Sequence, residues 1–443
     1  MSTISNNNYY YSASTVHSAL EKAVSSLSEN IACYSSDPVS DFTRNRKLNC
    51  SNLIHYILHL SNKTIQSGLM DYFSDIDDMP SASVISQQRY KCRPEAFKTR
   101  VFSLFTSYFT NYKTYNGYYL LACDGSDINI SHNPKDKTTY HINTSATRGY
   151  NQLHLNALYD VLNGIYADVN IDTAAKTHEC GALEEMIESH QYPENSIIIC
   201  DRGYEKYNLM ACCIEKNQKF IIRVKDIHSN GILSTMHLDD AAFDTHITKR
   251  VTYLQTNETK DNELYTILVN ESAPFDYLPA DHDWYEMNVR AVRFKITEDT
   301  YECLLTNLTE DEMPFEEFKE IYHLRWGIET SFRDLKYTVG LLYFHSSDQK
   351  LIRQEIYTSL TLFNFSRIIV NNSPPVQKAE WKWHYKVNFK TAVTNIRLYL
   401  DGKINEEELE KRIKKFLTPI RPGRKYSRNV KSQSCKTPSY YAA

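Results

Sequence analysis

The stretch SIIICDRGYEKYNLMACCIEKNQKFIIRVK, residues 196–225, indicates the fold class of this chain. Residues 196–200 form a short apolar run typical of a buried strand, residues 204–217 have helical periodicity, and residues 219–225 form another apolar run. A strand, a helix and a second strand in this order are typical of an α/β sheet. Asp201 follows the first strand directly, where functional side chains often meet beyond the carboxyl ends of strands.

The residues before this stretch predict three more strands and a helix. Asn163-Gly164 is a strong signal for a tight hairpin turn between two of the strands. GALEEMIESH, residues 181–190, has the spacing of an amphipathic helix. The predicted order through residue 225 is therefore βββαβαβ, which indicates a mixed α/β sheet. The three strand-like stretches are YYLLACD (118–124), HLNALYDVL (154–162) and IYADVNID (165–172).

The residues that follow residue 225 interrupt this order with further strand-like stretches. In one of them Val292, Phe294 and Ile296 alternate with polar residues, which indicates an antiparallel sheet with one face in water. We therefore predict an all-β insertion at residues 226–310 that divides the α/β core into two parts. Its strand-like stretches are ITKRVTYLQT (247–256), ELYTILVN (263–270), NVRAVRFKIT (288–297) and YECLLTNL (301–308).

Helical regions are expected on both sides of this core. LNCSNLIHYILHL and PEAFKTRVFSLFTSYF have apolar residues at steps of three and four, whereas residues 1–40 are rich in Ser, Asn and Tyr with little periodicity. The expected parts are a loosely ordered segment (1–40), a helical domain (41–117), the first part of the core (118–225), the β insertion (226–310), the second part of the core (311–370) and a helical, basic C-terminal region (371–443).

The composition narrows the class of protein. Hydrophobic residues make up 42% of the 443 residues, and no apolar run approaches the ~18 residues that a membrane helix needs. The ten cysteines form no C-x-x-C pair, and the N-terminus does not resemble a signal peptide, so we expect a cytoplasmic protein without membrane contact. The 12 glycines are too far apart for a Walker loop or a dinucleotide-binding fingerprint.

The charge of the chain is unevenly distributed. The net charge is −4, so the chain as a whole has no signature of nucleic-acid binding. Residues 411–443 nevertheless contain ten Lys or Arg residues and no Asp or Glu, which makes the local field positive. Taken alone, this segment also fits a solvated tail.

The stretch IYHLRWGIETSFRDLK, residues 321–336, has polar residues in a regular pattern beside an apolar helix face. Tyr322, Arg325, Glu329 and Lys336 are separated by nearly whole turns and therefore share one stripe that borders the core face. On an unknown helix this stripe also fits a solvated face with an ion pair between Arg325 and Glu329. The apolar face contains Ile321, Leu324, Ile328, Phe332, Leu335 and Val339.

Two aspartates end apolar strands of the predicted core. Asp124 ends LLACD and Asp201 follows SIIIC, so both lie where the carboxyl ends of strands form a shared crevice. Each aspartate alone also fits ordinary turn chemistry, because Gly or Arg-Gly follows it. Together with Glu329 on a later helix, they make a set of three acidic residues.

These residues resemble the signature of the insertion-sequence-four family of DDE transposases. The gaps of 2, 3 and 6 residues between Tyr322, Arg325, Glu329 and Lys336 reproduce the tyrosine, arginine, glutamate and lysine of the family's catalytic helix. The stretches that begin at Asp124 and Asp201 look like its first and second aspartate motifs, and the family also places a β insertion before the glutamate. The resemblance covers about residues 40 to 430 and implies a ribonuclease-H-like fold.

The resemblance implies a chemistry and a ligand set. Asp124, Asp201 and Glu329 would be catalytic and would hold two Mg²⁺ or Mn²⁺ ions about 4 Å apart, because such ions prefer carboxylate oxygens and stabilise charge in phosphoryl transfer. Tyr322, Arg325 and Lys336 would bind the DNA, the arginine as a fork and the lysine as a point charge.

The resemblance also implies partners and a course of reaction. The protein would bind the terminal inverted repeats of an insertion sequence, cut them and join them to target DNA, as a homodimer in the synaptic complex. The N-terminal helical domain and the basic C-terminal region would contact DNA. Excision through a hairpin requires an aromatic side chain to stack a flipped base, and the sequence does not select among Trp326, Tyr301 and Trp284.

Two other classes of protein remain open on sequence grounds. One is a catalytically silent DNA-binding derivative of a transposase, although binding alone does not require three convergent acids. The other is a different ribonuclease-H-like nuclease, which would not need the stripe of Tyr322, Arg325 and Lys336. Asp127, three residues after Asp124, fits an auxiliary metal ligand, but we expect it to cap a turn; we expect Asp334 to be solvated and the histidines to be structural or on the surface.

Overall fold

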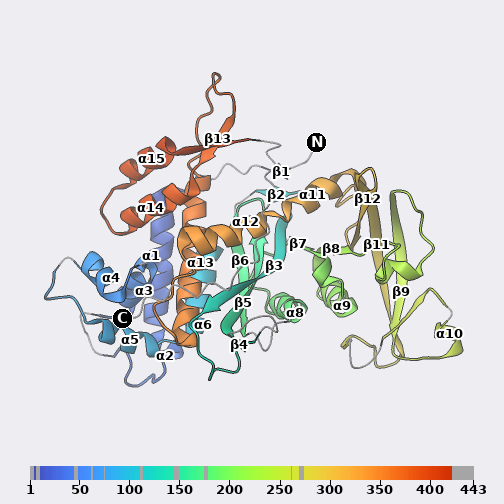
Figure 1. Ribbon diagram of the computed structural model, residues 1–443, viewed down its shortest axis with the longest axis horizontal. Helices are drawn as coiled ribbons and strands as arrows, with labels where there is room; N and C mark the ends of the chain where they lie inside the picture. Colours follow the sequence, from blue (N-terminus) through green and yellow to red (C-terminus); the bar gives the residue numbers. More distant parts are fainter. Residues whose placement is uncertain are drawn as a thin grey trace.

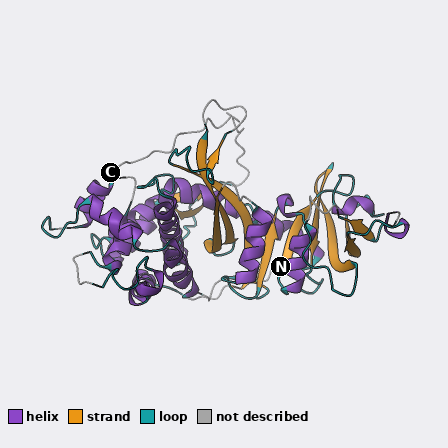
Figure 2. Cartoon of the chain, turned by 90° about the horizontal axis from the view of Figure 1, so that it is seen from below, coloured by secondary structure: helices purple, strands orange, loops and turns teal. Residues whose placement is uncertain are grey.

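The computed structural model describes residues 4–5, 10–43, 48–60, 63–73, 75–109, 113–142, 149–173, 178–260, 262–268 and 274–421. The protein is a mixed α/β structure in which one long sheet runs away from a group of helices contributed by both ends of the chain (Figure 1). Figure 2 shows the same division from below, with the helical part on one side and the far strands of the sheet on the other. No helix in these ranges is long and apolar enough to cross a membrane.

The centre of the sheet has the predicted βββαβαβ order. Its strands lie in the order β6-β5-β3-β7-β8, with antiparallel pairing among the first three and parallel pairing from β3 to β7 and from β7 to β8. This is the ribonuclease-H-like arrangement expected from the sequence. The strands are β3 (Tyr119–Ile130), β5 (Tyr150–Asp160), β6 (Ile165–Thr173), β7 (Ser196–Cys200) and β8 (Lys219–Val224), and the helices are α8 (Glu179–Ser189) and α9 (Tyr207–Glu215).

The β insertion continues this sheet. Strand β12 pairs antiparallel with β8, so the inserted strands extend the central sheet to ten strands instead of forming a second sheet. A single helical turn, α10, interrupts the otherwise β-rich insertion. The inserted elements are β9 (Phe243–Thr252), α10 (Asn257–Lys260), β10 (Tyr265–Ile267), β11 (Trp284–Thr297) and β12 (Thr300–Thr306).

The N-terminal helices begin earlier than the sequence analysis predicts. The expectation of a loosely ordered segment at residues 1–40 is wrong for residues 13–34, because Val16, Leu20 and Val24 form a buried stripe of a helix among the serines. The Ser12 side chain caps this helix by accepting a hydrogen bond from Thr15 N. The helices are α1 (Ala13–Glu29), α2 (Ile31–Tyr34), α3 (Cys50–His59), α4 (Ile65–Tyr72), α5 (Ala82–Tyr90), α6 (Pro94–Ala96), the π-helical η1 (Phe97–Ser103) and α7 (Leu104–Ser107).

Helix α13 (Gln349–Asn371) joins the helical part to the sheet. It is buried on most of its circumference, and its apolar residues share one core with the N-terminal helices and with β3, β5 and β6. Arg89 on α5 forms a buried ion pair with Glu355 on α13, with 2.7 Å between Nη2 and Oε1. The remaining C-terminal elements are β13 (His384–Val387), α14 (Phe389–Leu400), α15 (Glu406–Lys415) and β14 (Leu417–Ile420).

The predicted catalytic helix is divided into three segments. They are α11 (Phe318–Leu324), α12 (Gly327–Asp334) and the π-helical turn η6 (Leu335–Val339). The short elements elsewhere are β1 (Ile4–Ser5), β2 (Thr114–Tyr115), β4 (Tyr140–His141), η3 (Arg202–Tyr204), η4 (Ile232–Thr235) and η5 (Phe315–Glu317).

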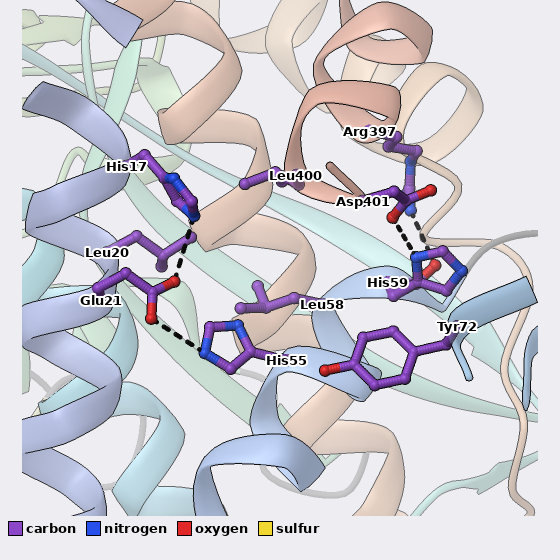
Figure 3. Close-up of a pocket in the computed structure, with 10 residues that line it drawn as sticks. All are labelled: His17, Leu20, Glu21, His55, Leu58, His59, Tyr72, Arg397, Leu400 and Asp401. Carbon is purple, nitrogen blue, oxygen red and sulfur yellow. Dashed lines mark hydrogen bonds and ion pairs between the residues drawn. The ribbon is translucent and has the colours of Figure 1, made fainter. Parts of the chain in front are cut away.

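A pocket away from the sheet lies where α1, α3 and α4 meet α14 (Figure 3). Glu21 accepts contacts from His17 and His55, each with 3.2 Å between the imidazole Nε2 and a carboxylate oxygen. His59 pairs with Asp401 on the opposite wall. The His55 pair joins α1 to α3 and the His59 pair joins α3 to the end of α14, which agrees with the structural role expected for most histidines.

Candidate active site

The strand register brings Asp124 and Asp201 together. Ala122 on β3 pairs with Ile199 on the parallel strand β7, so residues two positions further on, Asp124 and Asp201, are level on neighbouring strands. Neighbouring strands lie about 4.8 Å apart, and residues at the same level point to the same face. Asp124 Oδ1 accepts a hydrogen bond from Gly125 N at 2.9 Å, and Asp201 Oδ1 accepts one from Gly203 N at 2.8 Å.

Arg325 connects these aspartates to Glu329. The distance from Arg325 Nη2 to Glu329 Oε1 is 3.6 Å, and the guanidinium also interacts electrostatically with Asp124 and Asp201. Burial lowers the pKa of Arg325, but the surrounding phenol and carboxylate groups raise it above its usual value. The three predicted catalytic acids therefore share one buried cation.

The environment of Asp124 disfavours the charged form of its carboxyl group. Burial raises the pKa of Asp124, and the charges of Asp201 and Glu179 raise it further. The Gly125 N–H and the charge of Arg325 act in the opposite direction, and the resulting pKa is about 6. A nearby cation would relieve this repulsion.

Two members of the polar stripe are buried and lack hydrogen-bond partners. Tyr322 is 3% exposed and Arg325 is 4% exposed. Among the described residues, neither the Tyr322 hydroxyl nor the Arg325 Nε has a hydrogen-bond partner. The residue pattern alone also fits a stripe exposed to solvent, but these two residues lie inside the protein. Buried donors without partners are rare and are often found where a ligand binds.

The helix that carries the stripe changes its hydrogen-bond pattern twice. Arg325 N bonds to Tyr322 O and Ile328 N bonds to Arg325 O, both at 3.1 Å and both three residues back in the chain, which tightens the helix around Arg325. After Asp334 the helix widens into the π-helical turn η6. Such changes within a helix often occur at functional positions. They replace the single regular helix that the periodicity predicts.

Lys336 is part of the wide turn η6 and reaches strand β3. Its Nζ donates hydrogen bonds to Ser126 Oγ at 2.8 Å and to the Asp127 carbonyl oxygen at 2.7 Å. An ammonium group has three donors, so these bonds use two of them. Lys336 thus fixes the end of this helix to the strand that carries Asp124.

Three residues near the carboxylates have roles that the sequence analysis missed. Asp127 does not cap a turn: it lies on β3, and its Oδ1 is 2.8 Å from Nδ1 of His154 on β5. Nε2 of the same buried histidine is 3.2 Å from Glu179 Oε1 at the start of α8. Burial lowers the pKa of His154, but its interactions with the two carboxylates, a hydrogen bond at Nδ1 and an ion pair at Nε2, raise it to about 9. The cross-strand pair of Asp127 and His154 could be recognised only once the register is known.

Asp334 also differs from expectation. It is not simply solvated, because its Oδ2 accepts a hydrogen bond from Arg367 Nη2 on α13 at 2.6 Å. Arg367 in turn lies over the ring of Phe389 on α14, with 3.6 Å from the guanidinium carbon to the ring centroid. This contact anchors the end of α12 to the C-terminal helices, so Asp334 is a structural residue.

The basic C-terminal segment is partly neutralised where the structure describes it. On α15, Lys411, Arg412 and Lys414 each pair with a glutamate four residues earlier. These basic side chains are therefore not an unbalanced positive surface. Residues 422–443, which contain most of the other basic residues of the segment, lie outside the described residues.

The carboxylate oxygens of the site are suitable ligands for a hard divalent cation. Asp and Glu oxygens are the ligands that Mg²⁺ and Mn²⁺ prefer. Among the residues described here, no three His, Cys, Asp or Glu side chains stand close enough around one point to hold a metal ion as placed. The positive charge of the Arg325 guanidinium partly replaces such a cation, because it interacts with Asp124, Asp201 and Glu329. The donor set fits a divalent cation in its ligand chemistry.

The fold and the acidic strand ends define an α/β enzyme of the phosphoryl-transfer class. Residues 115–365, more than half of the chain, match the model of the family described as the transposase DDE domain, and the chain therefore belongs to this family of DDE transposases. Its reaction is the metal-dependent transfer of DNA phosphoryl groups.

Comparison with individual proteins adds little to this assignment. No curated protein sequence matches the chain. One solved structure that matches is the cryo-EM structure of a piggyBac transposase synaptic complex with hairpin DNA, at 10% sequence identity and a TM-score of 0.43. The match covers 96% of this chain and 89% of that chain.

Proposed function

We propose that this DDE transposase belongs to the insertion-sequence-four group, and that it binds the terminal inverted repeats of its element, cuts the DNA there and joins the ends to target DNA. The spacing of Tyr322, Arg325, Glu329 and Lys336 supports this group assignment. The position of the β insertion, between β8 and α11, also supports it.

The observation that carries the proposal is the level placement of Asp124 and Asp201 on parallel strands, with Arg325 linking them to Glu329. We assign these three acids as the ligands of two Mg²⁺ or Mn²⁺ ions. When bound, such ions would lower the pKa of an attacking water or 3′-hydroxyl and stabilise the leaving oxygen. A protein that only binds DNA would not require these three acidic side chains near one another.

The polar stripe would bind the scissile DNA strand from beside the carboxylates. Without DNA, Arg325 neutralises the acids, and its unpaired Nε leaves donor capacity for a phosphate. Lys336 would stabilise a phosphate by its charge while it holds β3 in place. The unpaired Tyr322 hydroxyl would donate to a phosphate oxygen near the cut end.

The proposed hairpin step requires an exposed aromatic ring near the site. Trp326 is 47% exposed and is adjacent to Arg325 in the chain. The Arg325 guanidinium carbon is 5.4 Å from the centroid of the Trp326 ring. Tyr301 and Trp284 are nevertheless less exposed, with Arg293 over the Tyr301 ring and both Arg250 and His282 in contact with the Trp284 ring. Of the three candidates, Trp326 is therefore the best placed to stack a flipped base.

We further propose that the protein acts as a homodimer on double-stranded DNA, with residues 41–117 and the C-terminal region contacting the transposon ends. The helices of these two regions share a core with α13, so DNA bound to them would be positioned relative to the carboxylates. Dimer formation would be detected by light scattering with and without the DNA end.

The test is cleavage and joining of a labelled DNA that carries the element's own end, with Mg²⁺ or Mn²⁺. Wild type is compared with Glu329→Gln and with Glu320→Gln, an exposed glutamate on α11 that serves as the matched control. We expect wild type and the control to cut and join only with a divalent ion, and Glu329→Gln to bind the end without cutting it. Equal cleavage by Glu329→Gln would remove this residue from the catalytic set, and metal-dependent cutting of unrelated DNA would favour a general nuclease.

A further inference from the structure

A fourth carboxylate lies beside the two aspartates. Glu179 is the first residue of α8, and its side chain turns back toward the sheet. A Cβ atom placed on Gly125 would be 2.5 Å from Glu179 Oε1, and one on Gly203 would be 3.9 Å from Glu179 Oε2. The carboxylate therefore occupies space that the absence of a side chain at Gly125 leaves open, and it lies within van der Waals distance of the corresponding position at Gly203.

The two glycines follow the two catalytic aspartates in the chain. Gly125 is the residue after Asp124, and Gly203 is the second residue after Asp201. An alanine at position 125 would collide both with Glu179 and with His154, whose Nε2 lies 2.2 Å from the position of the added Cβ. The small residue at this point lets the Glu179 carboxylate lie against β3 next to Asp124, from the face of the sheet opposite to the Asp124 side chain.

A buried histidine holds Glu179 in this position. His154 contacts Glu179 through Nε2 and Asp127 through Nδ1, so the imidazole is fixed from both sides. Asp127 lies on the same strand as Asp124, and its carbonyl oxygen accepts the hydrogen bond from Lys336. Glu179 is thus connected through fixed groups to the strand and the helix that carry the proposed ligands.

Interaction with the helix dipole, the common structural role of an acid at the start of a helix, does not explain the position of Glu179. A glutamate in the first turn of a helix interacts favourably with the helix dipole and can do so while pointing to solvent. Glu179 instead contacts a buried imidazole and lies over the glycines beside Asp124 and Asp201. Arg325, only 4% exposed, interacts electrostatically with Asp124 and Asp201 and has an Nε without a partner among the described residues, which independently indicates that the site at these aspartates can accept a ligand.

We infer that Glu179 is a fourth carboxylate of the catalytic site that binds divalent cation, and that His154, fixed by Asp127, positions it. This inference rests on the proposed function of Asp124, Asp201 and Glu329. Glu179 contributes a carboxylate oxygen to the cation, directly or through a bound water. His154 is a positioning residue, because it acts only through Glu179.

The test measures Mn²⁺ binding to the full-length protein by electron paramagnetic resonance, separately from activity. The variants are Glu179→Gln, Asp124→Asn and, as the matched control, Glu188→Gln, an exposed glutamate on the same helix. We expect Glu179→Gln to weaken Mn²⁺ binding about 10-fold, the lower end of what loss of a supporting group costs in metal sites. Asp124→Asn should weaken it at least as much, and Glu188→Gln should not change it.

His154→Ala tests the positioning role through the metal dependence of cleavage. We expect this variant to need about 10-fold more Mn²⁺ for half-maximal cleavage and to regain most of the wild-type rate at saturating Mn²⁺. A thermal unfolding curve shows whether the variant is folded. If it is folded and its rate is low at every Mn²⁺ concentration, the positioning role is wrong.

The outcomes separate this inference from the proposed function. If Asp124→Asn loses Mn²⁺ binding while Glu179→Gln binds as tightly as wild type, the fourth-carboxylate inference is overturned and the proposed function stands. If neither substitution changes Mn²⁺ binding or cleavage, the proposed catalytic set itself is wrong.

Discussion

Buried arginines in two regions of the protein differ in how many of their N–H groups are hydrogen-bonded. In the β insertion, Arg290 and Arg293 are 1% and 3% exposed, and each forms a two-pronged pair with an aspartate. Both also donate to backbone carbonyl oxygens. Arg325 in the catalytic region is equally buried, but its Nε has no partner among the described residues and its nearest carboxylate oxygen is 3.6 Å away.

This difference distinguishes an arginine that stabilises the fold from one that is available to a ligand. A buried charge is tolerated when hydrogen bonds replace water on all sides, as they do around Arg293. Around Arg325 the protein bears the cost of unpaired buried groups, which natural structures usually retain only for function. The catalytic region should therefore respond to added cation or DNA, and the insertion should not.

The largest expected effect is on catalysis. Asp124→Asn removes one of the proposed ligands while leaving the shape of the site nearly unchanged. We expect the rate of DNA-end cleavage to fall more than about 100-fold, because even supporting groups of metal sites cost 10–100-fold. Gel-shift measurements should show DNA-end binding within a few-fold of wild type. A variant that cuts normally would contradict the role of Asp124.

The second effect is on stability and separates the two kinds of arginine. Arg293→Met removes two hydrogen bonds to the partly exposed Asp226, which keeps its contact with Cys303 Sγ, so we expect the free energy of unfolding in urea to fall by about 1.5–3 kcal/mol, the usual value of hydrogen bonds to a charged group. Added Mg²⁺ should not restore it. For Arg325→Met we expect a smaller loss and substantial recovery with Mg²⁺, since a cation can replace the guanidinium. Equal responses to Mg²⁺ would remove the distinction.

The third expected effect is a pH dependence of the free energy of unfolding, caused by Asp226 in the insertion. Hydrogen bonds from Arg293 lower the pKa of Asp226 from 3.8 to about 2, although burial opposes them. Because the folded-state pKa is depressed, this contribution to stability is fully present above about pH 4 and is lost as the pH falls through 2. Asp226→Asn should abolish that part of the acid dependence in urea unfolding. An unchanged acid profile would show that the pair does not set it.

The smallest structural effect is expected at Tyr322. Its buried hydroxyl has no partner among the described residues, so Tyr322→Phe should leave the free energy of unfolding within about 0.5 kcal/mol of wild type. Cleavage of the DNA end should nevertheless fall about 10-fold, the value of one hydrogen bond to a charged group. A clear loss of stability with normal cleavage would assign the hydroxyl to the fold.

Local sequence patterns predicted much of this fold. The apolar runs around Asp124 and Asp201 are strands, and their ends meet because the strands are parallel and in register. The strands of the insertion also lie where alternation predicted them, but their attachment to β8 depends on pairing between distant segments, which periodicity does not report. In the N-terminal region, the serine-rich composition concealed the buried stripe of α1.

The site was less predictable than the fold. Spacing placed Arg325 and Glu329 on one stripe but could not show that Arg325 is buried, because burial depends on which distant segments fold around a helix and spacing does not report this. Glu179 and His154 carry no local signal, since an acid at a helix start and a histidine in a strand are both ordinary. Their contact follows only from the antiparallel register of β3 and β5 and the return of α8 to the sheet.

The most direct test of the account is an anomalous difference map from crystals of the full-length protein soaked in MnCl₂. We expect a peak at about 2.1 Å from carboxylate oxygens of Asp124 and Asp201, with Arg325 moved from its present position between the acids. A protein that cuts its DNA end with Mn²⁺ but shows no peak at these aspartates would contradict the central claim.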